Sequence, residues 1–346
     1  MAMERLLVVG GKQRSKAIGL DEWQAYEKGV ILEVKPESGN VEVVVEYESP
    51  TDVRPATLPA IVFKAGALNS DQSRILVCTQ TELVEFDTKT WNQTFYFSHP
   101  FFNDVHHACY RKDFAAGERI LVANTGLDQI LEFRMNRESN LDSELVNQWS
   151  VSESDTWARF DRDVDYRLVA TTKPHQCHPN FVWEVGERII ATRFHQQDAF
   201  DVVNKTVVCE KLPGNPHDGL RHGSLVYFTT TNGCVVSYDW QSGKRIESIE
   251  LSEIQQATEL LGWCRGIELS SELIAWVGFS RIRPTWLRKN LSWIKQGFRR
   301  KGEYGTLPTR IAQYDLKSRQ LLHEFDLEPY GLNAVFGIYS VSQERR

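Results

Sequence analysis

The sequence lacks the motifs of several common protein classes. Its six cysteines include no CxxC pair, so the chain offers no zinc-ribbon or thioredoxin-type motif. The first apolar run, LLVV at 6–9, is followed at once by Gly10 and Gly11, and it is too short for a signal-peptide core or a membrane span. We therefore expect buried, reduced thiols, no transmembrane segment and a cytoplasmic location.

An excess of positive charge is also missing. The chain has 40 lysines and arginines against 46 acidic residues, which gives a net charge of −6. Because binding to a phosphate backbone normally requires a positive field, we expect no nucleic-acid partner. No GxxxxGK[ST] motif follows Gly10 and Gly11, so a phosphate-binding loop of that type is excluded as well.

What recurs along the chain is a β pattern. Short apolar runs alternate with turn residues, and few stretches show helical spacing. A pair of strands repeats at intervals of roughly 40 to 50 residues. The first strand of the pair ends in a small polar residue, and the second ends in an acidic residue that is followed by a polar hairpin. Copies of this pair occupy 75–92, 120–133, 189–206 and 225–244, and a fifth copy is split into 273–280 and 310–320.

Self-similarity at this period, with four strands per repeat, predicts a β-propeller. The repeats between about 60 and 328 supply five blades. A sixth blade combines the strand at 333–342 with three strands from the N-terminus, which would leave no free sheet edge. The predicted fold is thus all-β, a six-bladed β-propeller with N- and C-terminal strands sharing the closing blade, in one domain over 1–346.

Two insertions interrupt the repeats. Residues 150–173 contain acidic residues, arginines and Trp157, and we expect a structured loop over one face. Residues 281–304 contain eight lysines or arginines before Glu303, with apolar residues among them, which is typical of a short amphipathic basic helix. Three interpretations of this helix stay open: a lid that attracts an acidic substrate, a contact for a protein partner or a membrane surface, and a solvated helix.

Candidate polar residues recur at the first strand of five of the six blades, the strand that lines the central channel of a propeller. Three consecutive blades each place a histidine there, although the chain has only nine. A single histidine at a strand start is usually a structural, hydrogen-bonded residue, but recurrence at matched positions favours a binding site. Blade by blade the candidates are Asp104, His106 and His107; His175, His178 and Asn180; His217 and Asp218; Arg265; and Asn333.

These residue types allow more than one kind of chemistry. Neutral imidazoles that converge from separate strands are suitable ligands for a divalent transition metal, with open positions for water or substrate. Alternatively the set binds a small polar or anionic molecule directly, with the guanidinium of Arg265 as a fork for a carboxylate or phosphate. Histidine also suits proton transfer near neutral pH.

At these residues the chain resembles a family of uncharacterised bacterial propeller proteins, a domain of unknown function. Its successive motifs DxHD, CHxNG, PHS and LRG have counterparts here in DVHH at 104–107, CHPN at 177–180, PHDG at 216–219 and CRG at 264–266. The chain departs from the pattern at Phe181, which replaces a glycine, and at Asp218, which replaces a small hydroxyl residue. The family has no settled activity, so the resemblance implies the fold and a binding site. The positions that match its motifs are His106, His178, Asn180, His217 and Arg265.

From these observations we assign expected roles. The metal ligands are His106, His178 and His217, and either Asp218 or His107 moves protons. Period-two alternation points His107 to the other face of its strand, so packing is an equal interpretation for it. The expected substrate-binding residues are Arg265, Asn180, His175 and Asn333.

The leading functional hypothesis is a propeller that binds a small polar molecule in a histidine-lined central pocket and acts as a metal-assisted lyase, hydrolase or isomerase of specialised metabolism. One competing hypothesis is a non-catalytic protein-interaction scaffold that uses the basic insertion at 281–304. Another is a metabolite-binding sensor without turnover. Nothing in the sequence identifies the substrate.

Overall fold

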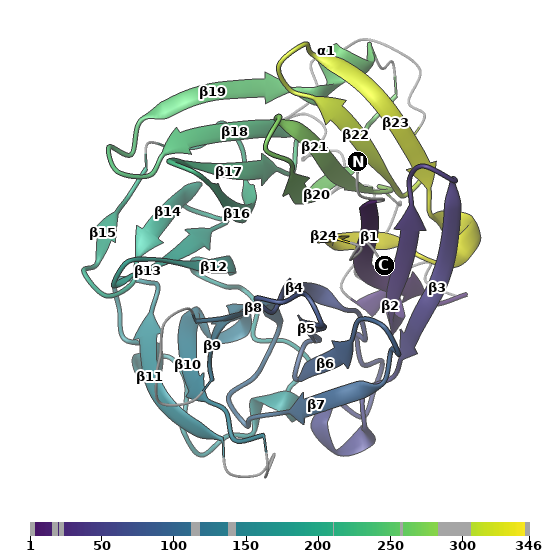
Figure 1. Cartoon of the computed structure of the whole chain (residues 1–346). Coiled ribbons are helices and arrows are strands. Elements are labelled where there is room, and N and C mark those ends of the chain that lie inside the picture. The colour runs from purple at the N-terminus through teal and green to yellow at the C-terminus, as the bar shows by residue number, and fades with distance from the viewer. Residues whose placement is uncertain are drawn as a thin grey trace. The chain divides into compact units, whose positions relative to one another are not determined.

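The computed structural model describes residues 4–15, 20, 24–111, 118–137, 143–209, 211–256, 259–282 and 306–342. Strands dominate them, as the apolar repeat predicts, and they form an all-β, propeller-like fold of antiparallel meanders (Figure 1). The chain divides into two compact units. The first comprises Met1–Glu48, Ala60–Phe63 and Leu212–Arg346, and the second comprises Ser49–Pro59 and Lys64–Lys211.

The first unit contains three four-stranded sheets. In sequence, α1 (Leu251–Gln255) lies between two of these sheets, and η6 (Glu328–Tyr330) precedes the last strand. The sheets, in hydrogen-bonded order, are β16 (Pro216–His222), β17 (Leu225–Thr230), β18 (Cys234–Asp239) and β19 (Arg245–Glu250); β20 (Trp263–Leu269), β21 (Ile274–Ser280), β22 (Arg310–Asp315) and β23 (Gln320–Asp326); and β24 (Ala334–Ser342), β1 (Glu4–Gln13), β2 (Tyr26–Lys35) and β3 (Asn40–Tyr47).

The last of these sheets joins the two ends of the chain. Strand β24 pairs antiparallel with β1, from Glu4 opposite Ser342 to Gly11 opposite Ala334. This pairing confirms that the N- and C-terminal strands share a sheet. The split repeat is confirmed as well, because β21 and β22 are paired neighbours although residues 281–309 separate them in sequence.

The second unit contains three further meanders. The first two are joined into one eight-stranded sheet by a single parallel pair between β4 and β8, Ala65 opposite His107. The meanders are β4 (Lys64–Leu68), β5 (Arg74–Cys78), β6 (Leu83–Asp87) and β7 (Gln93–Phe97); β8 (Val105–Tyr110), β9 (Arg119–Asn124), β10 (Gln129–Arg134) and β11 (Glu144–Ser150); and β12 (Pro179–Val185), β13 (Arg188–Arg193), β14 (Asp198–Asp201) and β15 (Thr206–Val207).

Short 3-10 helices fill the connections of the second unit. They are η2 (Thr51–Val53) and η3 (Thr125–Leu127), and the insertion at 150–173 contains η4 (Thr156–Ala158) and η5 (Tyr166–Leu168), so this insertion is structured. Of the basic insertion, residues 283–304 lie outside the described residues, so its predicted helix stays a prediction. Across the described ranges, no helix is long and apolar enough to cross a membrane.

Strands with continuous apolar runs lie in sheets that are buried on both faces. In β9, RILVAN, every residue after Arg119 is buried, as expected for a sheet that packs against neighbours on both sides. Leu121 and Ala123 belong to one apolar cluster, while Ile120 and Val122 belong to another. All six cysteines are free thiols and five are buried, which confirms the expected thiol state.

A β-bulge interrupts the first strand of all six meanders. The pairing of β8 with β9, for instance, jumps from Val105 to His107 and leaves His106 as the extra residue. The extra residue of a bulge breaks the two-residue alternation, so its side chain is aimed differently from its neighbours. The register shifts fall between Lys64 and Ala67, Val105 and His107, Pro179 and Phe181, His217 and Leu220, Cys264 and Ile267, and Val335 and Gly337.

Within the second unit, the ring of His107 connects three of these bulged strands. The Nε2–H of His107 on β8 donates to the carbonyl of Gly66 on β4 at 3.1 Å, and its Nδ1 accepts from the N–H of Val182 on β12 at 3.2 Å. The ring also stacks on Phe181, with centroids 3.6 Å apart. Both ring nitrogens are therefore engaged by backbone groups, which favours the packing interpretation of His107, and its role in proton transfer stays a prediction.

Because the ring must be neutral to accept from Val182, we predict that His107 makes the protein sensitive to acid. Burial lowers the pKa of His107 to about 3, despite the two backbone hydrogen bonds. The unfolded chain takes up this proton near pH 6.5. Stability from this group is thus complete above about pH 6.5 and falls as the pH drops towards 3, by at most about 5 kcal/mol.

The His107→Gln variant removes this titration while an amide can still donate and accept. Urea unfolding between pH 7 and pH 4 should show a smaller acid-side slope for His107→Gln than for the wild type. His323→Gln, at an exposed position of β23, is the matched control and should keep the wild-type slope. Equal slopes for wild type and His107→Gln would contradict the assignment.

Candidate functional site

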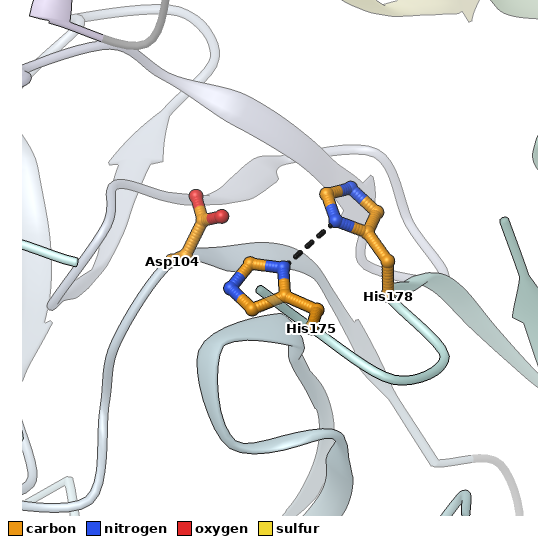
Figure 2. Close-up of side chains that lie close together, drawn as sticks. All are labelled: Asp104, His175 and His178. Carbon is orange, nitrogen blue, oxygen red and sulfur yellow. Dashed lines mark hydrogen bonds between the residues drawn. The ribbon is translucent and has the colours of Figure 1, made fainter. Parts of the chain in front are cut away.

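The second unit brings together one carboxylate and two imidazoles. Asp104 lies just before β8, and His175 and His178 lie just before β12 (Figure 2). One ligand atom from each of the three side chains lies within 4.8 Å of the others. Asp104 and His175 are buried and His178 is half-buried, so the cluster is largely shielded from water.

Two of these residues have left-handed backbone conformations, which aspartate and histidine adopt more often than most other non-glycine residues. Asp104 has a φ of 51° and His178 a φ of 56°, both in the left-handed region. A non-glycine residue there is uncommon and must be held by its surroundings, and such residues concentrate at functional sites. Asp104 and His178 each lie within two residues of the extra residue of a bulge, so the local bend explains how both side chains leave the strand alternation.

The conformation of the 176–178 turn is fixed by Asp128. This residue ends the η3 turn with a φ of 51° and is 1% exposed. Its Oδ1 accepts from the N–H groups of Cys177 at 3.0 Å and His178 at 2.8 Å, and its Oδ2 accepts from the N–H of Gln176 at 2.7 Å. A carboxylate that accepts three successive N–H groups places His178 in a defined position relative to the sheet of β8 to β11.

The insertion at 150–173 supports the same turn. The guanidinium of Arg159 donates to Oδ2 of Asp128 at 2.8 Å and completes the hydrogen bonding of this carboxylate. The side-chain amide of Asn103 donates to the carbonyls of Tyr166 at 2.9 Å and Val169 at 2.8 Å, next to Asp104 in sequence. The insertion thus buttresses both chain segments that carry the cluster.

Lys64 of β4 forms a buried ion pair with Asp104. The ammonium donates to Oδ1 of the carboxylate, and Lys64 is only 4% exposed. Burial is the largest single influence and would raise the pKa of Asp104, but the basic groups around the carboxylate, Lys64 foremost, together outweigh it and hold this pKa well below its usual value. Burial also lowers the pKa of Lys64, although Asp104 opposes the shift. Asp104 is therefore an anion at neutral pH, as a metal-ligating carboxylate must be.

Three histidine rings adjoin this ion pair. The Nδ1 atoms of His175 and His178 are 2.9 Å apart and share a hydrogen bond, and the rings of His106 and His178 meet edge to face with centroids 4.8 Å apart. Burial lowers the pKa of both His175 and His178, that of His178 well below its usual value with a further contribution from His106. Both rings are therefore neutral near pH 7, the form that ligates metals.

The Nδ1–H of His106, the extra residue of the β8 bulge, donates to the backbone carbonyl of Asp104 at 2.8 Å. A ring fixed through one nitrogen presents the other in a defined direction. In the described part of the chain, the ligand atoms that lie within 4.8 Å of one another belong to Asp104, His175 and His178. Of the expected metal ligands, His178 belongs to this group, and the metal-binding roles of His106 and His217 stay predictions.

The remaining predicted residues fall in different places. Asn180 is fully buried and is the extra residue of the β12 bulge, in the second unit. Asn333 belongs to the first unit, where its carboxamide oxygen accepts from the N–H of Gln13 at 2.8 Å, a contact that ties two chain ends together. His217, Asp218 and Arg265 also belong to the first unit, all at or beside bulges.

Asp218 has an unusual environment for a carboxyl group. It is 4% exposed, has a φ of 64°, and accepts hydrogen bonds from the hydroxyl of Thr229 and, at 3.1 Å, from the N–H of Gly266. Burial raises the pKa of Asp218 to about 7, although these two donors and Arg265 oppose the shift. A carboxyl that titrates near neutrality is compatible with the proton transfer that we expected of it.

Sequence reasoning missed three residues of the site. Lys64 carried a signal, since it is the one charged residue in the apolar run IVFKAGAL at 61–68. Asp128 was hidden in the turn TGLDQ at 125–129, which resembles any polar hairpin. His195 lies outside the repeated motif positions, so no pattern in the sequence marks it; it is exposed, but its ring centroid lies 5.6 Å from that of His178.

Comparisons with known proteins bear on the fold. No family model matches the chain, and no curated protein matches it. Among solved structures, a "putative 6-phosphogluconolactonase" from Bacteroides fragilis is similar with a TM-score of 0.53 at 11% identity, covering 99% of this chain and 98% of that one. A chain of the nidogen/laminin complex is similar with a TM-score of 0.53 at 9% identity, covering 97% and 98%. These similarities support a propeller-like fold and leave the family resemblance of the short motifs a prediction.

We predict that Asp128→Asn loosens the 176–178 turn. The amide nitrogen of asparagine cannot accept a hydrogen bond, so it would face the N–H donors of Gln176 and Arg159. Loss of hydrogen bonds to a buried charged group should lower the free energy of unfolding by about 2 to 3 kcal/mol. Chemical denaturation measures this loss.

Asp71→Asn is the control, because Asp71 also accepts a backbone N–H in a turn, that of Ser73 at 2.9 Å, but is exposed. It should change the free energy of unfolding by less than about 0.5 kcal/mol. A loss for Asp128→Asn as small as that for Asp71→Asn would contradict the role assigned to Asp128.

Proposed function

We propose that the cluster of Asp104, His175 and His178 binds a divalent transition metal ion and that the protein is a metal-dependent enzyme acting on a small polar molecule. The observation that carries the proposal is the convergence of two neutral imidazoles and one ionised carboxylate within 4.8 Å. Two histidines and one carboxylate are the protein ligands of several catalytic zinc sites and of non-haem iron(II) sites.

The surroundings fit a metal centre. A carboxylate has two oxygens, so Asp104 can keep its bond to Lys64 through one oxygen and offer the other to an ion, as the outer-shell partners of ligating carboxylates do. The proton shared by His175 and His178 must leave one Nδ1, or the ion must use Nε2. Asp128 and Arg159 then hold the ligand-bearing turn from behind.

Three protein ligands leave coordination positions for water and substrate. An ion held in this way would polarise a carbonyl group or generate a hydroxide nucleophile, which suits the lyase, hydrolase and isomerase classes that we expected. The similarity to a "putative 6-phosphogluconolactonase" supports this proposal only in showing that a related fold is assigned to an enzyme.

We also propose that the six meanders are six blades of one propeller. Support comes from the bulge at the same place in the first strand of each meander, which marks them as copies of one unit. A crystal structure with six meanders around one axis would bear this out, and any other arrangement would refute it.

Metal analysis tests the proposed centre. Purified protein supplemented with Zn²⁺, Co²⁺ or, without oxygen, Fe²⁺ should retain one equivalent of at least one of these ions after dialysis. Asp104→Asn, His175→Ala and His178→Ala should each weaken the binding of that ion by about 100-fold or more, because losing a ligand costs more than losing an outer-shell partner.

His323→Ala removes an exposed histidine of β23 and should bind the ion as the wild type does. Circular dichroism establishes that each variant is folded. If no ion is retained by the wild type, the proposed metal centre is refuted. Stoichiometric metal without turnover of any small polar molecule would favour the metabolite sensor.

A further inference from the structure

Among the described residues of the first unit, the guanidinium of Arg265 forms no ion pair, although it interacts electrostatically with the carboxyl group of Asp218. Arg265 on β20 is half-buried, and its Nε has no contact with water and no hydrogen-bond partner. Its guanidinium lies over the ring of Phe336 at 4.9 Å and over that of Trp263 at 5.5 Å. Within the described part of the chain, no hydrogen bond or ion pair of this guanidinium is present.

Other arginines over aromatic rings are arranged differently. Arg193 lies over Phe200 and pairs with Asp198 at 2.6 Å, and Arg310 lies over Phe279 and pairs with Glu324 at 2.8 Å. Arg221 lies over Trp240 but is exposed, so water can solvate it. A guanidinium that is partly desolvated without an anionic partner is unfavourable. Arg265 is therefore the position where an external anion would restore the missing interactions.

We propose that Arg265 is the centre of a separate binding site, built from first-unit residues alone, for the carboxylate group of a small organic acid. The two aromatic rings cover the guanidinium, and its N–H edge supplies the planar fork that a carboxylate accepts bidentately. The adjacent rings of Phe336 and Trp263 suit the carbon skeleton of the acid.

A carboxylate fits the local charge better than a phosphate. The Asp218 carboxyl adjoins this site, since its neighbour Gly266 donates to it at 3.1 Å and Arg265 acts on it electrostatically. A single guanidinium balances the one negative charge of a carboxylate. The second charge of a phosphate would lie beside the carboxyl group of Asp218, which disfavours it.

The bulge explains why Arg265 occupies this position. The register of β20 shifts between Cys264 and Ile267, and Gly266 has a φ of 80°. A Cβ on Gly266 would lie 3.3 Å from the Cα of Gly337 on β24, so the glycine allows the two strands to approach closely. This approach brings Phe336 of β24 beneath the guanidinium of Arg265.

Isothermal titration calorimetry with acetate, benzoate and inorganic phosphate tests the site. The measurements are made in EDTA, so the outcome is independent of the proposed metal centre. We expect saturable binding of at least one carboxylate by the wild type, about tenfold or more weaker binding by Arg265→Gln, and wild-type binding by Arg221→Gln. Arg265→Lys keeps the charge without the fork and should be intermediate.

A thermal unfolding scan separates binding from a structural role. Because Arg265 makes no hydrogen bond within the described residues, Arg265→Gln should unfold within a few degrees of the wild type, and excess carboxylate should stabilise the wild type but not the variant. Should Arg265→Gln not fold, the wild type and Arg265→Lys provide the same comparison. The proposal is overturned if the wild type binds neither carboxylate, if it prefers phosphate, or if both Arg265 variants bind as the wild type does.

Discussion

The geometry of the Asp104, His175 and His178 cluster depends on the hydrogen bonds that Asp128 accepts. Two ligands of the candidate centre lie on a connection between sheets, where the chain has no ladder of its own to fix it. The carboxylate of Asp128 supplies that order by accepting the N–H groups of residues 176–178, and Arg159 keeps its charge compensated. A buried carboxylate is costly unless it is satisfied in this way, so the turn and the acid stabilise each other.

The β-bulges allow polar side chains to lie in strands that are otherwise buried on both faces. A regular strand alternates its side chains between two buried faces, and polar groups on either face would enter the apolar clusters that stabilise the sheets. One extra residue removes His106, Asn180 or Arg265 from this alternation without ending the strand. The same device recurs in all six meanders, so polar chemistry can change from repeat to repeat while the packing of the flanking residues is kept.

Periodicity made much of the fold predictable from the sequence. The strand pairs, the split repeat around residue 281 and the shared terminal sheet all follow from apolar spacing and turn residues, and the pairings of β24 with β1 and β21 with β22 confirm them. The motif positions His106, Asn180, Asp218 and Arg265 were found for a physical reason, since each lies within a bulge.

The composition of the cluster could not be predicted in the same way. Residues at matched positions of neighbouring repeats need not have side chains in contact. His175 contacts His178 from a loop, and Asp104 lies before its strand and not within it. Asp128 acts through backbone N–H groups, which leave no mark in the sequence of the turn that it holds. Contacts of this kind depend on left-handed backbone conformations at Asp104, Asp128 and His178, and the sequence of a turn does not show which of its residues adopts this conformation.

Lys64 and Arg265 differ in how the protein compensates the charge of their side chains. Lys64 is nearly inaccessible, and its charge is met inside the protein by Asp104, so its environment is complete without a ligand. Arg265 is half-buried and has aromatic faces on its guanidinium, and it forms no ion pair or hydrogen bond with the described residues. A protein can retain such an arrangement, although it lowers the stability of the free protein, when a ligand supplies the missing anion. The unpaired charge then contributes to the affinity for the ligand and favours ligands with an acidic group. Lys64 accordingly serves to orient Asp104, whereas Arg265 is suited to recognise a molecule from outside the chain.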